Sequence, residues 1–189
     1  MDLDLADFGT AKTGGRGNQF STFVKNFDRG QQFLRFEEIL QCVQLPDLSE
    51  DDPAKTRDLF DDLFTKLKKD FGVKRIMRLV AWDNLLRGVE DNMIAKWVND
   101  FQVEDLDWRK LHLDLDCFSP SLPLRIIRLY SRGNWGALYF WTSDEGVLKF
   151  DTVCSYIYAQ NRKACEADGT QLEEVRFDIL TESNSVRRT

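Results

Sequence analysis

The chain of 189 residues is long enough for one domain with a hydrophobic core, and 42% of its residues are hydrophobic and 31% charged, as in a folded protein. Its net charge of −6 disfavours nucleic acid or an anionic membrane surface as a partner, because both need a basic protein surface. No apolar run approaches the roughly 20 residues of a membrane helix. The acidic N-terminal sequence MDLDLADFG fits neither a secretory signal nor a transit peptide, so we expect a cytoplasmic protein.

The first part of the chain predicts a leader and a helical segment. Residues 1–19 are rich in glycine and polar residues and are expected to be a flexible leader. Residues 20–52 form the predicted helical segment. It carries two groups of apolar residues at helical spacing, which are Phe20, Phe23, Val24 and Phe27 in the first group and Phe33, Phe36, Leu40 and Val43 in the second.

Residues 53–180 predict a domain in which helices and strands alternate. Its first helix has clear boundaries, because Asp52 can cap it, Pro53 suits the first helical position and Gly72 follows its end. A second helix is indicated by a similar apolar spacing at Met93, Ile94, Trp97, Val98 and Phe101. The remaining expected elements are strands within 73–82, 103–115, 124–130 and 152–158 and a helix over 135–148 that breaks near residue 146.

The C-terminal part of the chain is less specific. Residues 172–180 fit either a helix or a strand, and residues 181–189 predict a disordered tail.

The alternation of elements predicts an α/β fold, with a helical N-terminal segment followed by alternating helices and parallel strands. Two architectures fit, an open α/β sheet and a leucine-rich-repeat-like stack. The segment LRIIRLYSRGN echoes the pattern LxxLxLxxN, with Leu124, Ile127 and Leu129 in place and Asn134 out of register. The lengths of the successive units vary, so the sequence leaves both architectures open.

No catalytic group of residues is complete in this sequence. Asp7 begins an Asp-Phe-Gly that matches the metal-binding motif of protein kinases, but the other kinase motifs would have to precede it. The single histidine, His112, is expected to share one face of a strand with Asp114 and Asp116, an arrangement that can orient an imidazole base. No serine or cysteine stands in a nucleophile elbow beside it, so we predict no catalytic residue.

The chain also offers no pattern for a metal or a cofactor. Its cysteines, together with one histidine, match no zinc-ligand spacing and are expected to be reduced structural thiols; they are Cys42, Cys117, Cys154 and Cys165. A cluster of glycines near residue 15 lacks the Gly-Lys-Ser/Thr of a phosphate-binding loop. We therefore predict neither a metal site nor a bound cofactor.

Arg128, Arg132 and Trp135 form the candidate protein-binding surface. They are expected at the carboxyl end of a strand and the start of the next helix, the edge at which open α/β sheets bind ligands. Arginine can pair with a carboxylate through two hydrogen bonds, and tryptophan supplies apolar contact area. The alternative is that Trp135 packs into the local core. The predicted partner is a protein or an adjacent domain of the same polypeptide, and neither nucleic acid nor a membrane.

Three segments carry a family resemblance: FGVKRIMRLVAWD, VEDLDWRKLHLDLD and IRLYSRGNWGALYFWTSDEGVLKF. Their most specific parts are DWRKL at 107–111 and SRGNW at 131–135. The span from Phe71 to Tyr158 resembles the non-catalytic region that precedes the catalytic domain in fungal intracellular subtilisin-like serine proteases. The catalytic settings of that family are absent, since His112 is followed by leucine rather than glycine and no Gly-Thr-Ser-x-Ala occurs.

The resemblance implies a non-catalytic accessory or protein-interaction domain. A second interpretation is a fragment that belongs with the serine endopeptidases although it lacks their catalytic residues, which leaves open whether the full protein is an enzyme. A third interpretation is a leucine-rich-repeat-like adaptor unrelated to proteases.

Overall fold

A computed structural model describes residues 1–6, 16–26, 36–48, 52–83, 88–150, 154–160 and 174–180. Its strands form one sheet in the order β1-β2-β3-β4-β5-β6-β7. Neighbouring strands from β1 to β6 are parallel, and β7 is antiparallel to β6. The strands are β1 (Asp2–Asp4), β2 (Ile39–Gln44), β3 (Arg75–Trp82), β4 (Asp105–Arg109), β5 (Ile126–Ser131), β6 (Cys154–Gln160) and β7 (Glu174–Leu180).

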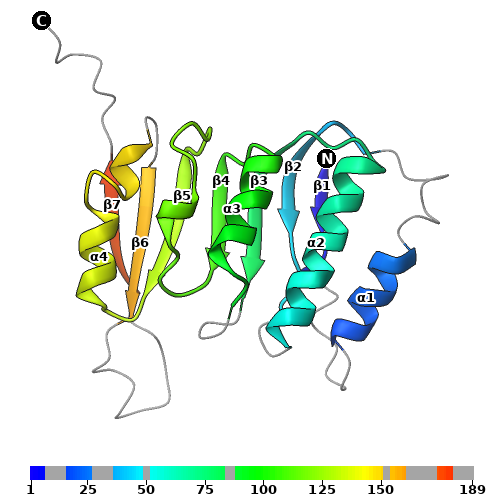
Figure 1. Cartoon of the computed structure of the whole chain (residues 1–189), viewed down its shortest axis with the longest axis horizontal. Coiled ribbons are helices and arrows are strands. Elements are labelled where there is room, and N and C mark those ends of the chain that lie inside the picture. The colour runs from blue at the N-terminus through cyan, green and yellow to red at the C-terminus, as the bar shows by residue number, and fades with distance from the viewer. Residues whose placement is uncertain are drawn as a thin grey trace, which may run out of the picture.

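The helices connect the parallel strands and lie in front of the sheet in Figure 1. This alternation confirms the predicted α/β fold class. Because the described strands follow one another in sequence order and the α-helices share one side, the arrangement is that of a one-sided stack. The helices are α1 (Arg16–Asn26), α2 (Pro53–Lys69), α3 (Asp91–Asp100) and α4 (Trp135–Trp141), with short 3-10 helices η3 (Leu115–Cys117) and η4 (Val147–Lys149).

Four consecutive strands carry the same apolar pattern, LxxLxL, on the side that faces the helices. Its middle members pair in register across the sheet, from Val43 to Leu79, Leu106 and Ile127. Burial of this continuous ladder explains why the strands stack in sequence order. All members are fully buried: Leu40, Val43 and Leu45; Ile76, Leu79 and Ala81; Val103, Leu106 and Trp108; and Leu124, Ile127 and Leu129.

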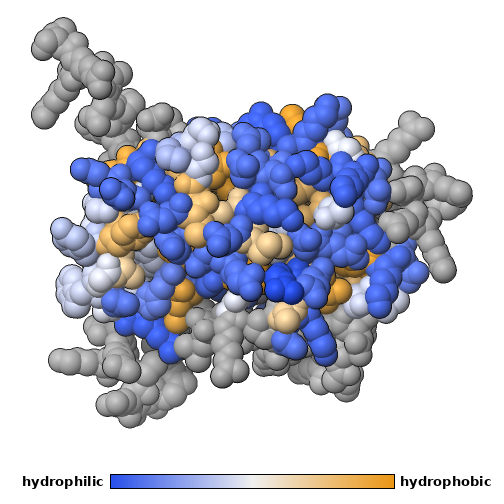
Figure 2. All heavy atoms as spheres, viewed as in Figure 1, coloured by the Kyte–Doolittle hydropathy of each residue, from blue (hydrophilic) through white to orange (hydrophobic). Residues whose placement is uncertain are grey.

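Side chains alternate along a strand, so the residues that flank and separate the second and third of these positions, such as Arg78, Val80 and Trp82 in β3, point to the opposite side of the sheet. We call this side of β1–β5 the open face, since the four described α-helices lie on the other side (Figure 1). Figure 2 shows the helical side, where hydrophilic residues cover most of the surface and hydrophobic residues appear in small separate areas.

Helix α2 begins and ends where the sequence predicts. The side chain of Asp52 accepts a hydrogen bond from the backbone N–H of Ala54 at 3.1 Å. At the other end, Gly72 adopts a positive φ of 68°, and the N–H of Val73 donates to the carbonyl of Leu67 at 2.9 Å. Local capping chemistry is therefore sufficient to locate this helix.

The prediction for the N-terminal part is wrong in three places, the first being that α1 begins at Arg16, inside the expected leader of residues 1–19. Asp2–Asp4 was expected in a flexible leader but forms β1, where Leu3 pairs with Val43 and Leu5 is buried. The second expected helix of the segment is instead strand β2. An apolar spacing of three residues fits a helix and also fits the LxxLxL pattern, and pairing with β3 selects the strand. The first expected helix does form, as α1.

The C-terminal part also differs from the prediction. Helix α4 ends at Trp141, earlier than the expected residue 148, and the chain then turns back. A Cβ atom at Gly146 would lie 2.3 Å from the carbonyl oxygen of Phe140, so this turn requires glycine. The ambiguous range 172–180 contains strand β7. No helix among the described residues is long and apolar enough to cross a membrane.

Candidate interaction surfaces

The three residues predicted as one binding surface lie on two different surfaces. Arg128 lies in β5 on the open face, where its guanidinium pairs with the carboxylate of Asp105 in β4. Arg132 is exposed in the turn after β5, and Trp135 is the first residue of α4. The structure therefore separates Arg128 from Trp135, and Arg132 lies in the turn between β5 and α4.

Trp135 does not pack into the local core, because 82% of it is exposed. Trp141, at the other end of α4, takes the core position that the alternative assigned to Trp135. Its indole N–H donates to the carbonyl of Leu113 at 2.9 Å. Trp141 therefore fixes α4 to the segment that contains Leu113, while Trp135 points to solvent.

Tyr139 extends the exposed aromatic surface of α4. It is 79% exposed and stands four residues after Trp135, so the two side chains lie on the same side of the helix. We call Trp135 and Tyr139 the α4 aromatic pair. Tyr139 was not predicted as a binding residue, although its spacing of four residues from Trp135 in WGALYFW places both on one side of a helix.

The open face carries a group of charged and aromatic side chains, formed across β3, β4 and β5. We call it the sheet-face cluster, and its members are Arg78, Trp82, Asp105, Asp107, Arg109, Arg128 and Tyr130. The register places Arg78 beside Asp105 and Trp82 beside Arg109. Neighbouring parallel strands therefore bring together residues that are distant in sequence.

The two aspartates of β4 hold the sheet-face cluster together. Asp105 pairs with Arg128, and its Oδ2 lies 3.6 Å from Nε of Arg78. Asp107 accepts a hydrogen bond from the hydroxyl of Tyr130 at 2.7 Å, and its Oδ1 lies 3.4 Å from Nε of Arg109. Each carboxylate therefore has polar partners on the neighbouring side chains.

The outer part of the cluster is cationic and aromatic. The guanidinium carbon of Arg109 lies 3.6 Å from the centre of the Trp82 ring, which is the geometry of a cation–π contact. Trp82 is 42% exposed and the side chain of Arg78 is 47% exposed, whereas Asp107 is buried. A molecule that approaches the open face therefore meets arginine and tryptophan before it meets the carboxylates.

The strand face that His112, Asp114 and Asp116 were expected to share does not form, because β4 ends at Arg109. His112 has a positive φ of 57°, and its ring lies 6.5 Å from that of Trp141. Asp114 instead caps η3, where its carboxylate accepts from the N–H of Asp116 at 3.0 Å. The imidazole and carboxylate thus have separate local roles.

The described thiols and acidic groups do not assemble a reactive centre. Burial raises the pKa of the Cys42 and Cys117 thiols, and the carboxylate of Asp114 raises that of Cys117 further. Both thiols are therefore protonated at neutral pH, which makes them weak nucleophiles. Within the described ranges, no group of three or more His, Cys, Asp or Glu residues could hold a metal ion. Asp7, the glycines before α1 and Cys165 lie outside those ranges.

The geometry thus presents the α4 aromatic pair and the sheet-face cluster as two separate surfaces for binding. Comparison with protein-family models, with curated proteins and with solved structures found no match.

Proposed function

We propose that this chain is a non-catalytic protein-interaction domain and that the α4 aromatic pair is a contact surface for a partner protein. The observation that carries the proposal is the exposure of Trp135 and Tyr139 on one side of a folded helix. Tryptophan and tyrosine are enriched among the residues that dominate binding energy in protein interfaces. Contact with a partner would remove both aromatic surfaces from water.

The anchoring of α4 supports this proposal. The carboxamide of Asn134 accepts from the N–H of Gly136 at 3.0 Å and caps the helix start, and Trp141 is buried at its end. The exposed pair is therefore presented on a preformed helix. Binding to a preformed surface loses less conformational entropy than binding that must first order a segment.

Two kinds of partner are proposed for this surface. The resemblance to the region before the catalytic domain of fungal subtilases makes an adjacent domain of the same polypeptide one candidate. A separate protein, bound by a leucine-rich-repeat-like adaptor, is the other. The LxxLxL ladder of β2–β5 favours the adaptor, because repeated units of this kind present extended binding surfaces.

The proposal is tested by affinity capture from host lysate with the parent chain and a Trp135→Ala/Tyr139→Ala variant. Both substituted side chains are exposed, so circular dichroism should show an unchanged fold. Proteins captured by the parent should be lost with this variant. The matched control is Ile39→Ala, which removes a different exposed apolar side chain and should retain the partners. An identical set of partners for parent and variant would contradict the proposed surface.

A benzophenone cross-linker at position 139 supplies an independent measurement. Irradiation should attach it to the same partner that the α4 variant loses. Cross-linking from position 39 should not attach that partner, since Ile39 lies in β2 and outside the α4 aromatic pair.

A further inference from the structure

We propose that the sheet-face cluster binds an extended acidic segment of a partner protein, chiefly through Arg78 and Arg109. This inference goes beyond the contact proposed for α4, because it concerns the opposite side of the sheet and specifies the chemistry of the ligand.

The first argument is the balance of charge in the cluster. Among the described residues of the cluster, three guanidinium groups face two carboxylates, those of Asp105 and Asp107. Arg128 is only 17% exposed and pairs closely with Asp105. Arg78 shares that same carboxylate at 3.6 Å while nearly half of its side chain faces solvent. Arg78 is therefore the guanidinium of this pair that a ligand carboxylate can reach from solvent.

The second argument is the orientation of Arg109. Its guanidinium lies over the Trp82 ring, and its Nε and Nη2 each donate to one oxygen of Asp107 at 3.4 Å, while Asp107 also accepts the shorter hydrogen bond from Tyr130. A guanidinium that stacks on an aromatic ring keeps its N–H donors in the plane of the group. Asp107 occupies the Nε–Nη2 edge, so a ligand carboxylate binds through two hydrogen bonds at the remaining Nη1–Nη2 edge.

The third argument is the distance between the two cationic groups. Arg78 is in register with Asp105, and Trp82 is in register with Arg109. At roughly 3.3 Å per residue, Arg78 and Arg109 are about 13 Å apart along the strands. Val80 lies between them on the open face and is itself buried, at 6% exposure, so it offers little surface of its own. An extended segment with two acidic residues at this separation matches the spacing of the two arginines.

The acidic residues of the open face limit where such a segment can bind. Asp2 and Asp4 are exposed on β1 at the edge of the sheet. Asp2 is in register with Cys42, and Cys42 is in register with Arg78. The side chains at this level of the sheet therefore change from acidic on β1 to basic on β3. Repulsion by β1 therefore confines an acidic segment to β3–β5 and sets its position on the sheet.

The test is fluorescence anisotropy with a labelled peptide, Thr-Glu-Thr-Val-Thr-Glu-Thr, and a counterpart in which both glutamates are glutamines. The parent should bind the glutamate peptide at least about tenfold more tightly, and added salt should weaken that binding. Arg78→Gln and Arg109→Gln should each reduce affinity by about tenfold, because each removes a charge-assisted hydrogen bond. Arg57→Gln is the matched control, since Arg57 lies on α2 on the helical side of the sheet and should not affect binding.

Several results would overturn the inference. Equal binding of the two peptides would exclude recognition of carboxylates, and an equal loss with Arg57→Gln would exclude this location. Tighter binding of a labelled single-stranded oligothymidine, lost with the same arginine variants, would assign the surface to nucleic acid instead.

Two further variants separate loss of peptide binding from loss of folding and from the contact proposed for α4. Arg109→Lys retains the charge but lacks the planar group, so it should fold and bind the peptide more weakly than the parent; unchanged affinity would contradict bidentate binding. The Trp135→Ala/Tyr139→Ala variant should retain peptide binding, which separates this inference from the proposed function.

Discussion

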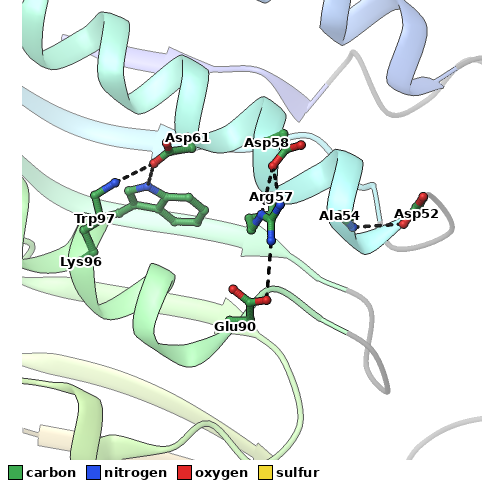
Figure 3. Close-up of polar contacts among 8 residues, drawn as sticks. All are labelled: Asp52, Ala54, Arg57, Asp58, Asp61, Glu90, Lys96 and Trp97. Carbon is green, nitrogen blue, oxygen red and sulfur yellow. Dashed lines mark hydrogen bonds and ion pairs between the residues drawn. The ribbon is translucent and has the colours of Figure 1, made fainter.

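Asp61 of α2 accepts a hydrogen bond from the indole N–H of Trp97 in α3 at 2.9 Å (Figure 3). The ammonium of Lys96 reaches the same carboxylate oxygen, also at 2.9 Å. The Trp97 ring stacks on Trp108 of β4, with the ring centres 5.8 Å apart. Trp97 of α3 therefore contacts both Asp61 on α2 and Trp108 on β4, and it links the two helices to the sheet.

Replacement of Trp97 by alanine should destabilise the fold by about 3–5 kcal/mol, because it removes a large buried side chain and leaves a cavity. Phe64→Ala should have an effect of similar size, since Phe64 is also buried and its ring centre lies 5.0 Å from that of Trp97. Denaturation by urea measures both. Asn99→Ala, at an exposed position of α3, should change stability little. An unchanged midpoint for Trp97→Ala would contradict the packing described.

Stability should depend on the ionisation of Asp61. Burial of this group favours a higher pKa, but the hydrogen bonds from Trp97 and Lys96 outweigh burial and hold the carboxyl pKa below its usual 3.8. The contribution of the carboxylate is therefore complete above pH 3.8 and is lost as the pH falls through the lowered pKa of the folded state.

The Asp61→Asn variant provides the measurement. It should melt at a lower temperature than the parent at neutral pH, and the two melting temperatures should converge as the pH falls below 3.8. Asp62→Asn is the control on the same helix, because Asp62 is more exposed than Asp61 and its carboxylate lies 4.0 Å from the ammonium of Lys66. If the difference in melting temperature between the parent and Asp61→Asn stayed constant with pH, the Asp61 carboxylate would not be the source of the stabilisation.

Asp83, at the end of β3, should be essential for stability. One of its carboxylate oxygens accepts from the backbone N–H of Val89 at 2.9 Å and from the indole N–H of Trp108 at 2.8 Å. Asp83→Ala leaves both buried donors without this acceptor and should cost about 3 kcal/mol. Asp83→Asn keeps an acceptor oxygen of the same size and should cost less. Chemical denaturation distinguishes the two variants, and an Asp83→Ala variant as stable as the parent would show that the carboxylate is not needed.

Arg128 should contribute to stability rather than to partner binding. Its ion pair with Asp105 is largely buried, so Arg128→Glu would place two carboxylates together on the open face. We expect a loss of about 3 kcal/mol, in the range for a broken buried ion pair. Thermal unfolding measures this loss, with Arg125→Glu as the control at a much more exposed position. Equal melting temperatures for the two variants would show that the Arg128 pair is unimportant.

The purified chain should not hydrolyse peptide substrates or react with a fluorophosphonate probe. The sequence contains none of the catalytic settings of the subtilases, and Asp114 caps η3 rather than orienting His112. A catalytic serine needs a neighbouring base that is held by a third group. Specific labelling of one serine, identified by mass spectrometry and abolished by denaturation, would overturn this prediction.

Much of the fold could be predicted where local chemistry decides the structure. Helix α2 is an example, since a capping aspartate, a proline at the first position and a glycine after the end act within the helix itself. Strands β3 and β4 also lie within their expected ranges, whereas β5 and β6 overlap theirs and end one and two residues later. The sequence left open whether the strands form an open α/β sheet or a leucine-rich-repeat-like stack, because periodicity does not specify which strands are neighbours or on which side the helices lie.

The candidate surfaces depended more strongly on tertiary structure. Arg128, Arg132 and Trp135 were predicted as one surface because of their residue types and their proximity in the sequence. Side chains alternate along β5, however, and Arg128 therefore lies on the open face beside Asp105. Arg78, Trp82 and Arg109 were not predicted as a group, since only the register of β3 with β4 brings them together. A usable signal was present in the recurrence of LxxLxL, because alternation assigns the residues that flank and separate its last two apolar positions to the opposite side of the sheet.

The sequence by itself determined that WGALYFW forms a helix, because an asparagine cap precedes it and its residues tolerate helical geometry. It did not determine which tryptophan enters the core. Only the tertiary structure decided that Trp141 is buried and Trp135 exposed, because the contact of Trp141 with Leu113 sets the rotation of α4 about its axis. Both tryptophans have the same intrinsic hydrophobicity, so their different burial depends on where the helix meets the rest of the molecule.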